Sequence, residues 1–513
     1  MVAAPPLAVR RAFTVPRLDA PAAAAGILAF AAAAGYSAVS IFRHGHFGST
    51  VDLAAQSQTV WGYSQLEIIP NTIVGIPNLL GDHFHPVLFL LAPFYWIWSS
   101  PEVLLIAQAV LLALAGLPIF LWGRERLGAV AGLAFMAAFL LYWGILAGME
   151  FDFHHIVFAV AALSWALYAA LTRRNRLLWA MVAVAMLSRE DVPLTLAALG
   201  FYIAVVQRRY VLGVAMAGAN VVWFGLLIGV IMPALAGGPY RHWTYQSLGT
   251  GPLSAIVHIV TRPLDSLELL FVPLAKTRIW IGSFGSWLFL PLVSPLTLIA
   301  IPYFLERFWN DWPSFWTFHM QYNMLPAPIL AMAAIDSLAR IKARWPQNIA
   351  LPSRAMPAMA LLVLAISAVG SFVIIRPLDD LAKTVSASTS ADIQACLDVI
   401  PPTASVAASQ ELVPHLASRR QIYGIPAEVA NQVYVDPNTL NPQFIAIDLA
   451  SGGSPDVAMR AAVSTALQGD YGIVCTRELT LVLQKGATEK TLSPDFQRWL
   501  AGGCSARACL TKP

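Results

Sequence analysis

The sequence predicts an α-helical polytopic membrane protein with a small α/β domain outside the lipid bilayer. Of its 513 residues, 58% are hydrophobic and only 12% are charged, a composition that excludes an ordinary soluble domain. The apolar residues gather into runs long enough to cross a bilayer, whereas the last part of the chain has only short apolar runs. Arginine and lysine form short clusters between the long runs, so the net charge of +4 reflects membrane topology and no nucleic-acid partner is expected.

The first apolar run, residues 21–42, follows Arg10, Arg11 and Arg17. Positive flanks stay in the cytoplasm, so residues 1–20 are expected to form a cytoplasmic tail before an uncleaved first helix. When the later basic clusters are placed on the same side, the chain makes about eleven crossings of the bacterial inner (plasma) membrane, and its C-terminus lies outside. The other expected spans are residues 102–122, 129–147, 156–172, 177–191, 192–207, 211–233, 255–275, 279–304, 324–341 and 356–375.

Two apolar segments are too short for ordinary spans. Residues 86–98 would invert every later basic cluster if they crossed, so we interpret them as a re-entrant or interfacial segment. The predicted span 177–191 is also short, which places Arg189, Glu190 and Asp191 at or just below the outer surface.

The chain changes character after the last expected span. We predict a transmembrane domain over residues 21–375 and an extracytoplasmic α/β domain with a largely parallel sheet over residues 376–513. The expected strands are residues 403–408, 433–436, 444–450, 471–476 and 479–484, and the expected helices are residues 391–400, 411–418 and 457–468. All four cysteines fall here and allow one or two disulfides, with Cys504 and Cys509 the favoured local pair.

Ionisable residues interrupt the long apolar runs, and the predicted topology places nearly all of them on the outer face. Such groups are costly near lipid and usually functional. One such residue alone is better explained as a cap at a helix end, but the shared face favours a single polar site. The residues are Asp52, Asp82, His83, His85, Glu150, Asp152, His154, His155, Arg189, Glu190, Asp191 and His319.

Two further outer loops add polar and aromatic side chains. Residues 239–251 contain Arg241, His242, Trp243 and Tyr245, and residues 306–323 contain His319, Gln321 and Tyr322. Their aromatic rings could stack on sugar faces, although anchoring at the membrane interface is the commoner role.

These loops contain the groups that group-transfer chemistry needs. An aspartate can accept the proton of an attacking hydroxyl, and an arginine or metal can stabilise a leaving phosphate. Glu150, Asp152, His154 and His155 offer the mixed oxygen and nitrogen donors of a divalent-metal site, for which Mg or Mn is the expected ion.

Several strings carry a resemblance to known proteins. The first external loop with Asp52, the acidic pair in the next loop and the outer α/β domain resemble the GT-C glycosyltransferases, which transfer sugars from polyprenyl-phosphate carriers. More closely, five strings resemble an uncharacterised bacterial family of predicted membrane proteins that is grouped with GT-C enzymes by fold. They are residues 51–53 (VDL), 81–86 (GDHFHP), 151–154 (FDFH), 189–191 (RED) and 319–322 (HMQY).

The resemblance implies roles for individual residues. Asp52 matches the first-loop acid that GT-C enzymes use as base or acceptor orienter, and Glu150 and Asp152 match the second-loop acids that bind metal in oligosaccharyltransferase-type members. The first loop lacks the paired acids of protein mannosyltransferase-like members. Asp82 is the other aspartate there, so both aspartates stay candidates for the base. Arg241 is our choice for the carrier phosphate.

The sequence therefore predicts a membrane glycosyltransferase that moves a sugar from a lipid-linked donor to a cell-envelope glycan or lipid. The predicted catalytic residues are Asp52, Asp82 and Asp152, with Glu150 and Asp152 as metal ligands. The predicted substrate-binding residues are His83, His85, His154, His155, Arg189, Glu190, Arg241, His319 and Tyr322. A transporter or flippase is the first alternative, although the charges lie near one face and no internal repeat is evident. A non-catalytic cell-envelope assembly protein is the second.

Overall fold

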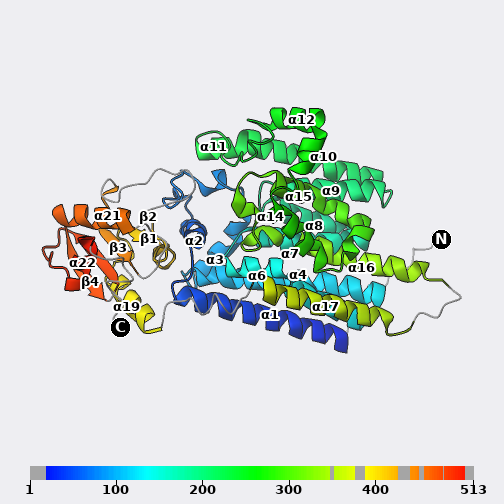
Figure 1. Cartoon of the computed structure of the whole chain (residues 1–513), viewed down its shortest axis with the longest axis horizontal. Coiled ribbons are helices and arrows are strands. Elements are labelled where there is room, and N and C mark those ends of the chain that lie inside the picture. Colours follow the sequence, from blue (N-terminus) through cyan, green and yellow to red (C-terminus); the bar gives the residue numbers. More distant parts are fainter. Residues whose placement is uncertain are drawn as a thin grey trace, which may run out of the picture.

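The protein consists of a long helical bundle with a small sheet domain at one end (Figure 1). The computed structural model describes residues 19–346, 352–375, 387–425, 440–449, 456–477 and 479–502. This arrangement confirms the predicted class of a helical membrane protein with an added α/β sheet domain.

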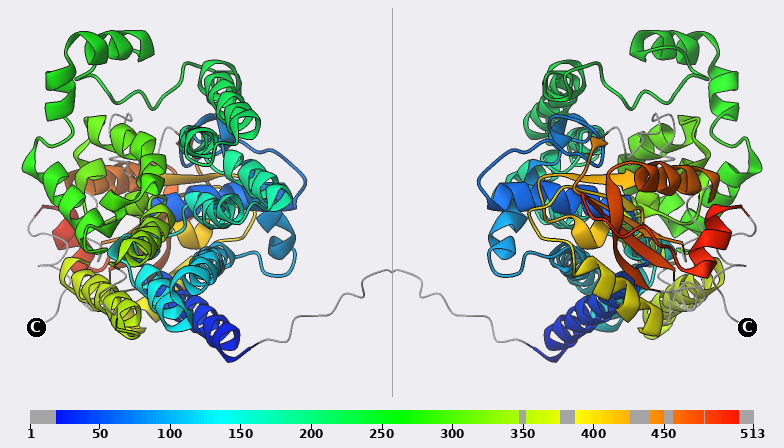
Figure 2. Two further views of the ribbon diagram at one scale, coloured as in Figure 1. Left: turned by 90° about the vertical axis from the view of Figure 1, so that its right-hand side faces the viewer. Right: turned by 90° about the vertical axis from the view of Figure 1, so that its left-hand side faces the viewer.

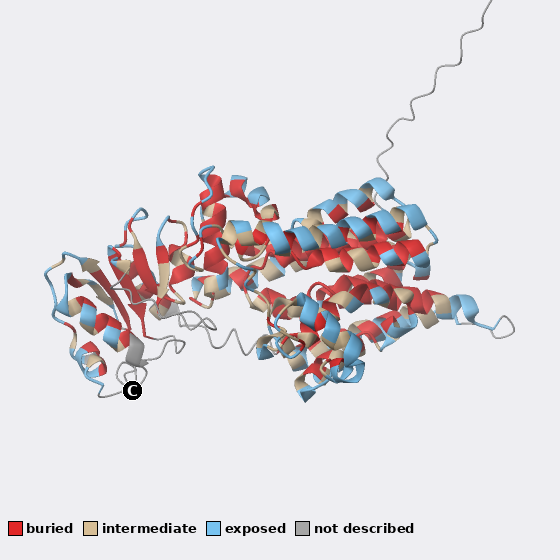
Figure 3. Cartoon of the chain, turned by 90° about the horizontal axis from the view of Figure 1, so that it is seen from above, coloured by how far each residue is buried: buried red, intermediate tan, exposed pale blue. Residues whose placement is uncertain are grey.

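Six helical segments among the described residues are long and apolar enough to cross a bilayer. They are Ala20–Gly45, Glu102–Leu127, Ala129–Glu150, Tyr210–Ala236, Gln321–Arg344 and Ala355–Ile374. Figure 3 shows exposed residues along the outer sides of the bundle and buried ones along its centre. The exposed positions include large apolar side chains such as Phe30, Val211 and Val214, which is the pattern of a surface that faces lipid.

The bundle is organised around α4 (Glu102–Leu127), which packs against α1 (Ala20–Gly45), α5 (Ala129–Leu140), α7 (Ile156–Leu171) and α16 (Ala327–Arg344). Other described helices of this half are α6 (Trp143–Glu150), α8 (Asn175–Met186), α9 (Val192–Val205), α10 (Tyr210–Leu226), α11 (Met232–Ala236) and α17 (Ala355–Ile374).

Helices α9 and α10 cross at backbone contact because glycine lies at the crossing. A Cβ atom on Gly213 would lie 2.4 Å from the Ala204 nitrogen, so a larger residue would push the helices apart. This contact fixes α9, whose first turn follows Arg189, Glu190 and Asp191.

Two of the predicted spans are wrong as continuous helices. Residues 255–275 divide into α12 (Pro252–Thr261) and α13 (Pro263–Glu268). Residues 279–304 divide among α14 (Leu274–Gly285), two short 3₁₀ helices and α15 (Ile301–Trp309). Pro263, Pro291 and Pro295 explain the breaks because proline cannot donate the backbone hydrogen bond of a continuing helix.

The segment at residues 86–98 forms a 3₁₀ helix, η2 (Pro86–Leu91), followed by the short α3 (Ala92–Tyr95). This is too short to span a bilayer, as expected, and its re-entrant or interfacial placement stays a prediction.

The C-terminal sheet domain, named the outer domain because the sequence predicts it to lie outside the membrane, contains a five-stranded sheet in the order β2-β1-β3-β5-β4 (Figures 1 and 2). The strands are β1 (Val406–Ser409), β2 (Ile422–Ile425), β3 (Phe444–Asp448), β4 (Tyr471–Arg477) and β5 (Thr480–Lys485). The pairings β2-β1 and β1-β3 are parallel, but β3-β5 and β5-β4 are antiparallel. The prediction of a largely parallel sheet was therefore wrong, because the short connection after Arg477 forces β4 and β5 into a hairpin.

Helices α19 (Ala387–Leu397), α21 (Asp456–Gln468) and α22 (Pro494–Leu500) complete the described part of this domain. A disulfide between Cys396 and Cys475 connects α19 to β4, a pairing that the sequence did not single out. The predicted strand 433–436 and the predicted pair Cys504 and Cys509 lie outside the described residues.

Helix α2 (Val51–Ser64) lies between the bundle and the sheet (Figure 1). The Gln58 amide donates to the carbonyl oxygens of Arg419 and Arg420 at 3.3 and 3.2 Å. The Thr72 hydroxyl donates to the Ile422 carbonyl oxygen at 2.6 Å and accepts from the Ile422 nitrogen at 3.0 Å. The outer domain is thus attached through its backbone to the helix that begins one residue before Asp52.

Candidate functional site

Two adjoining cavities lie where the polar loops meet α2. The larger has a volume of about 350 Å³, and its lining includes Asp52, Gln56, Asp82, His154 and His155. The smaller has a volume of about 160 Å³, and its lining includes Glu190, Asp191, His242 and Glu306. Five residues line both cavities: His83, Arg189, Trp312, Gln321 and Tyr322.

The start of α2 presents Asp52 to the larger cavity. Thr50 caps this helix, because its hydroxyl accepts from the Asp52 nitrogen at 3.4 Å. The Asp52 side chain is 51% exposed, and its Oδ2 lies 3.7 Å from Nε2 of His154. A carboxylate with this exposure is accessible to a substrate hydroxyl.

Asp152 supports α2 from beneath and does not line either cavity. Its buried Oδ2 accepts a hydrogen bond from the Thr50 nitrogen at 2.6 Å. Gln108 fixes the same loop, since its side chain donates to the Asp152 carbonyl oxygen at 2.7 Å and accepts from the His154 nitrogen at 2.9 Å. Burial raises the pKa of the Asp152 carboxyl above its ordinary value.

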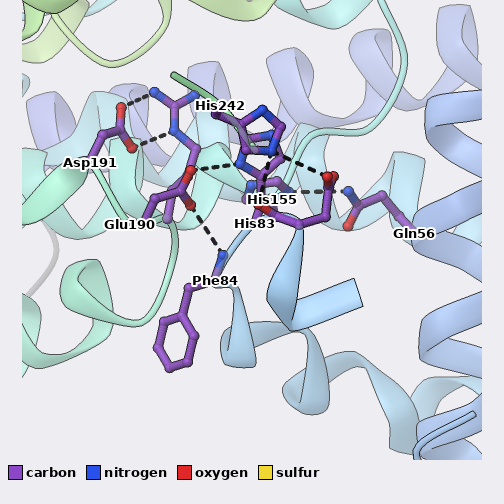
Figure 4. Close-up of polar contacts among 9 residues, drawn as sticks. Gln56, His83, Phe84, His155, Glu190, Asp191 and His242 are labelled. Carbon is purple, nitrogen blue, oxygen red and sulfur yellow. Dashed lines mark hydrogen bonds and ion pairs between the residues drawn. The ribbon is translucent and has the colours of Figure 1, made fainter. Parts of the chain in front are cut away.

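His83, which is about one third exposed, forms a pair with the buried Glu190 (Figure 4). His83 Nδ1 lies 2.7 Å from Glu190 Oε1, and the Phe84 nitrogen donates to Glu190 Oε2 at 3.1 Å. Burial by itself would lower the pKa of His83, but the Glu190 carboxylate outweighs it and raises that pKa to about 9. Burial would likewise raise the pKa of Glu190, but His83 holds it well below its ordinary value.

His242 approaches Asp82 from a loop 160 residues further along the chain. Its Nε2 lies 3.0 Å from the Asp82 carbonyl oxygen and 3.2 Å from Oδ1. The rings of His242 and His83 stack with centroids 4.3 Å apart, as Figure 4 shows. One potential metal-ligating atom from each of Asp82, His83 and His242 lies within 4.8 Å of the others.

Arg189 brings a guanidinium group to both cavities. Asp191 accepts two hydrogen bonds from it, and both side chains are about nine-tenths buried. Glu306 on α15 also lines the smaller cavity and interacts directly with Asp191. Burial and the Asp191 carboxylate raise the pKa of Glu306 well above its ordinary value, so it favours the protonated form.

His155 and His85 lie at the inner end of the site. The Gln56 amide nitrogen lies 3.2 Å from His155 Nδ1, and the His155 and His85 ring centroids are 4.4 Å apart. Burial lowers the pKa of both rings, to about 4 for His85, so both are neutral at physiological pH. His85 does not line either cavity, but its ring packs against His155, which does.

The structure brings together most of the residues that the sequence singled out, but not all. Arg241 and His319 are exposed and line neither cavity, whereas Arg189 lines both. The assignment of Arg241 to the carrier phosphate stays a prediction that the cavity lining does not support. Glu150 and Asp152 are not part of the converging metal-ligating group found among the described residues. Their predicted metal role stays a prediction.

Sequence reasoning did not select His242, Gln56 or Glu306. The signal for His242 was its place beside Arg241 in an outer loop, where only the fold shows which of the two turns inward. Gln56 lies one helical turn after Asp52 and could have been found from that spacing. Glu306 is the first residue of the predicted outer loop 306–323, but only the fold shows that it lines the cavity.

Comparisons with known proteins agree with this architecture. The family described as "Predicted membrane protein (DUF2079)" matches residues 43–479. No curated protein sequence matches the chain. ArnT from Cupriavidus metallidurans bound to undecaprenyl phosphate is similar in structure, with a TM-score of 0.55 and 14% identity over 89% of this chain and 97% of ArnT.

Two further solved structures are similar. ArnT from the same organism in the apo state has a TM-score of 0.51 and 14% identity over 84% of this chain and 92% of ArnT. The Archaeoglobus fulgidus oligosaccharyltransferase in complex with Zn and sulfate has a TM-score of 0.45 and 12% identity over 88% of this chain and 73% of that protein. The chain therefore belongs to the DUF2079 family of predicted membrane proteins and has the fold of the GT-C glycosyltransferases.

Proposed function

We propose that this protein transfers a sugar from a polyprenyl-phosphate carrier to a hydroxyl group of a cell-envelope glycan or lipid, at the outer face of the bacterial inner membrane. The observation that carries the proposal is the larger cavity, to which Asp52 and Arg189 contribute from separate elements. The fold supports it, because ArnT has been solved with undecaprenyl phosphate bound.

Asp52 is our candidate for the general base. The acceptor hydroxyl gives its proton to Asp52 as its oxygen bonds to the anomeric carbon, and the bond from that carbon to the carrier phosphate breaks with inversion. His154 lies close enough to orient the Asp52 carboxylate. Asp82 is the weaker candidate, since its carboxylate already contacts His242.

Arg189 is our candidate for stabilising the phosphate leaving group. Its guanidinium carries positive charge at the boundary of the two cavities, and Asp191 holds it in one orientation. Such preorganised charge is worth most where negative charge develops in the transition state.

We further propose that Asp82, His83 and His242 hold a divalent cation. The Glu190 bond to His83 Nδ1 leaves Nε2 for the ion, which is the usual outer support of a histidine ligand. Two imidazoles and one carboxylate suit manganese or zinc better than magnesium. A cation there would add positive charge beside the leaving phosphate.

Asp152, which the sequence placed among the catalytic acids, is proposed instead as a positioning residue. Its carboxylate is occupied by Thr50 beneath the start of α2. It therefore acts on the reaction through the position of Asp52. In this proposal the N-terminus lies in the cytoplasm and the sheet domain lies outside the membrane. The boundary between the two domains lies near residue 376.

The test is sugar transfer by membranes that contain the wild-type protein, with a panel of radiolabelled polyprenyl-phosphate sugars. Asp52→Asn should lower the rate by about 10²- to 10⁴-fold, the usual contribution of a general base. Asp398→Asn, the same change at an exposed position of the outer domain, is the matched control and should be neutral. If folded wild-type protein transfers no sugar from any donor, the proposal is wrong and a transporter or assembly role gains weight.

A further inference from the structure

The smaller cavity has the size of a single small ring. Its volume of about 160 Å³ is less than half that of the larger cavity. It is also below the roughly 300 Å³ at which pockets for drug-sized ligands begin. A second sugar residue would have to extend beyond this cavity.

The cavity wall combines aromatic faces with hydrogen-bonding groups. Tyr240, Tyr245, Trp312, Phe315 and Tyr322 contribute rings, and the rings of Phe315 and Tyr322 stack with centroids 4.2 Å apart. A pyranose ring offers apolar C–H faces that stack on such rings and a rim of hydroxyls that need polar partners.

The aromatic wall is held rigidly by one buried arginine. Arg307 is 2% exposed and donates to the carbonyl oxygens of Phe315 at 2.7 Å, Thr317 at 3.0 Å and Tyr322 at 3.2 Å. These bonds fix the loop that brings Phe315 and Tyr322 to the cavity. A wall held this way loses little conformational entropy when a ligand binds.

The acids of the wall differ in how they are engaged. Glu190 is paired with His83, and Asp191 is paired with Arg189. Glu306 forms no ion pair with a cation among the described residues; it interacts with the Asp191 carboxylate and feels the Arg189 charge more weakly. A protonated Glu306 gives its one proton to the hydrogen bond with Asp191, and its other oxygen can accept a hydrogen bond from a sugar hydroxyl.

We propose that the smaller cavity is a subsite for one monosaccharide ring and that Glu306 is a residue that recognises the hydroxyls of this ring. This inference rests on the proposed function and names its donor class: a monosaccharide joined to the carrier through a phosphate, not a preassembled oligosaccharide. The linking phosphate would lie at Arg189, where the two cavities adjoin.

The test measures equilibrium binding of three probes to detergent-purified full-length protein. The probes are a polyprenyl phosphate without sugar, the same carrier with one sugar, and the same carrier with a disaccharide. The single sugar should tighten binding about tenfold or more over the bare carrier, and the second sugar should add nothing or weaken it. If the disaccharide carrier binds tighter than the monosaccharide carrier, the proposal is wrong.

Three variants locate the effect at Glu306. Glu306→Ala should remove most of the roughly tenfold gain from the sugar, measured as the ratio of its affinities for the sugar-bearing and bare carriers, and its binding of the bare carrier shows that the protein is folded. Glu306→Gln, which keeps a donor and an acceptor, should retain the gain within about threefold. Asp398→Asn, at the exposed outer-domain position, should change neither affinity. Equal loss of both affinities in Glu306→Ala would overturn the proposal.

Binding separates this inference from the proposed function. A sugar-dependent gain in affinity without transfer to any acceptor would support the subsite and overturn the proposed transferase activity. Transfer without a sugar-dependent gain in affinity would support the transferase and overturn the subsite.

Discussion

Helix α2 contacts two polar regions that differ in construction: the candidate site and the junction with the outer domain. Ala55 and Gln56 lie one helical turn after Asp52, and all three residues line the larger cavity. Ala54 belongs to the buried cluster under the sheet of the outer domain, and Gln58 binds the backbone of that domain. One helix thus contributes to the candidate site on one face and to the junction with the outer domain on the other.

Histidines show the difference between the two regions most clearly. At the junction, His44 and His415 stack almost in parallel with centroids 4.1 Å apart, and His44 Nδ1 lies 3.1 Å from the Ser49 hydroxyl. In the cavities, His83 is held by a carboxylate and His154 lies near one that is half exposed. His44 also lies 4.0 Å from the Glu102 carboxylate, so neither burial nor a nearby carboxylate marks a functional histidine by itself; His83 and His154 differ from His44 because they line a cavity.

Among the variants that test this comparison, the largest effect is expected from removing the Arg189 guanidinium. Arg189→Ala should lower sugar transfer by about 10²- to 10³-fold, because the leaving phosphate loses its preorganised charge. It should also lower the free energy of unfolding by about 3 kcal/mol, since Asp191 is left buried without its partner.

Adding Asp191→Asn to this variant separates the two effects. Thermal unfolding should show much of the stability restored, while the transfer assay shows no recovery. If activity returned together with stability, Arg189 would belong with the structural polar groups of the junction.

Removing a metal should have the next largest effect. Incubation with a chelator should lower transfer about 10- to 100-fold, and manganese or zinc should restore it. The variant His242→Ala should have a low rate of sugar transfer before treatment, and that rate should change little when the chelator or the metal is added. Chelator resistance of the wild-type protein would show that Asp82, His83 and His242 act through hydrogen bonds alone.

A smaller effect is expected at Asp152, the buried acid that supports α2. Asp152→Asn keeps an acceptor for Thr50, so transfer should stay within about tenfold of wild type, far above Asp52→Asn. A rate as low as that of Asp52→Asn would place Asp152 in the chemistry itself.

The difference in stability between Asp152→Asn and the wild-type protein should depend on pH in a defined direction. Because burial raises the pKa of Asp152 above 3.8, the native state holds this proton more tightly than the unfolded state. Its stabilising contribution is present at low pH and is lost as the pH rises through the folded pKa. The melting temperature of Asp152→Asn relative to wild type should therefore increase between about pH 4 and neutral pH.

The smallest effect is expected at the junction. Gln58→Ala should destabilise the protein by about 1 to 2 kcal/mol, because backbone carbonyls of Arg419 and Arg420 lose a buried donor. Transfer should fall only a few-fold, through a shift of α2. Arg420→Ala removes an exposed pair with Glu67 and serves as the control, with less than about 1 kcal/mol expected. A loss comparable to that of Arg189→Ala would show that the outer domain takes part in the reaction.

Much of the fold could be predicted because its signals are local. The length of an apolar run and the arginines beside it identify helices such as α1, α4 and α17 without reference to any other part of the chain. Prediction failed where proline divides an apolar run, as at Pro263, and where a hairpin reverses a strand, as between β4 and β5.

The sequence by itself determined the membrane class, the presence of an outer sheet domain and the local groups from which the site is built, such as Asp52 and the Arg189–Asp191 turn. Hydropathy and charge act over a single helix or loop, so they can be read along the chain. Only the tertiary structure decided that His242 reaches Asp82 while Arg241 stays exposed, that Glu306 meets Asp191, and that Cys396 pairs with Cys475 across 79 residues. These pairings depend on how distant helices and strands pack, and no spacing in the sequence encodes that distance.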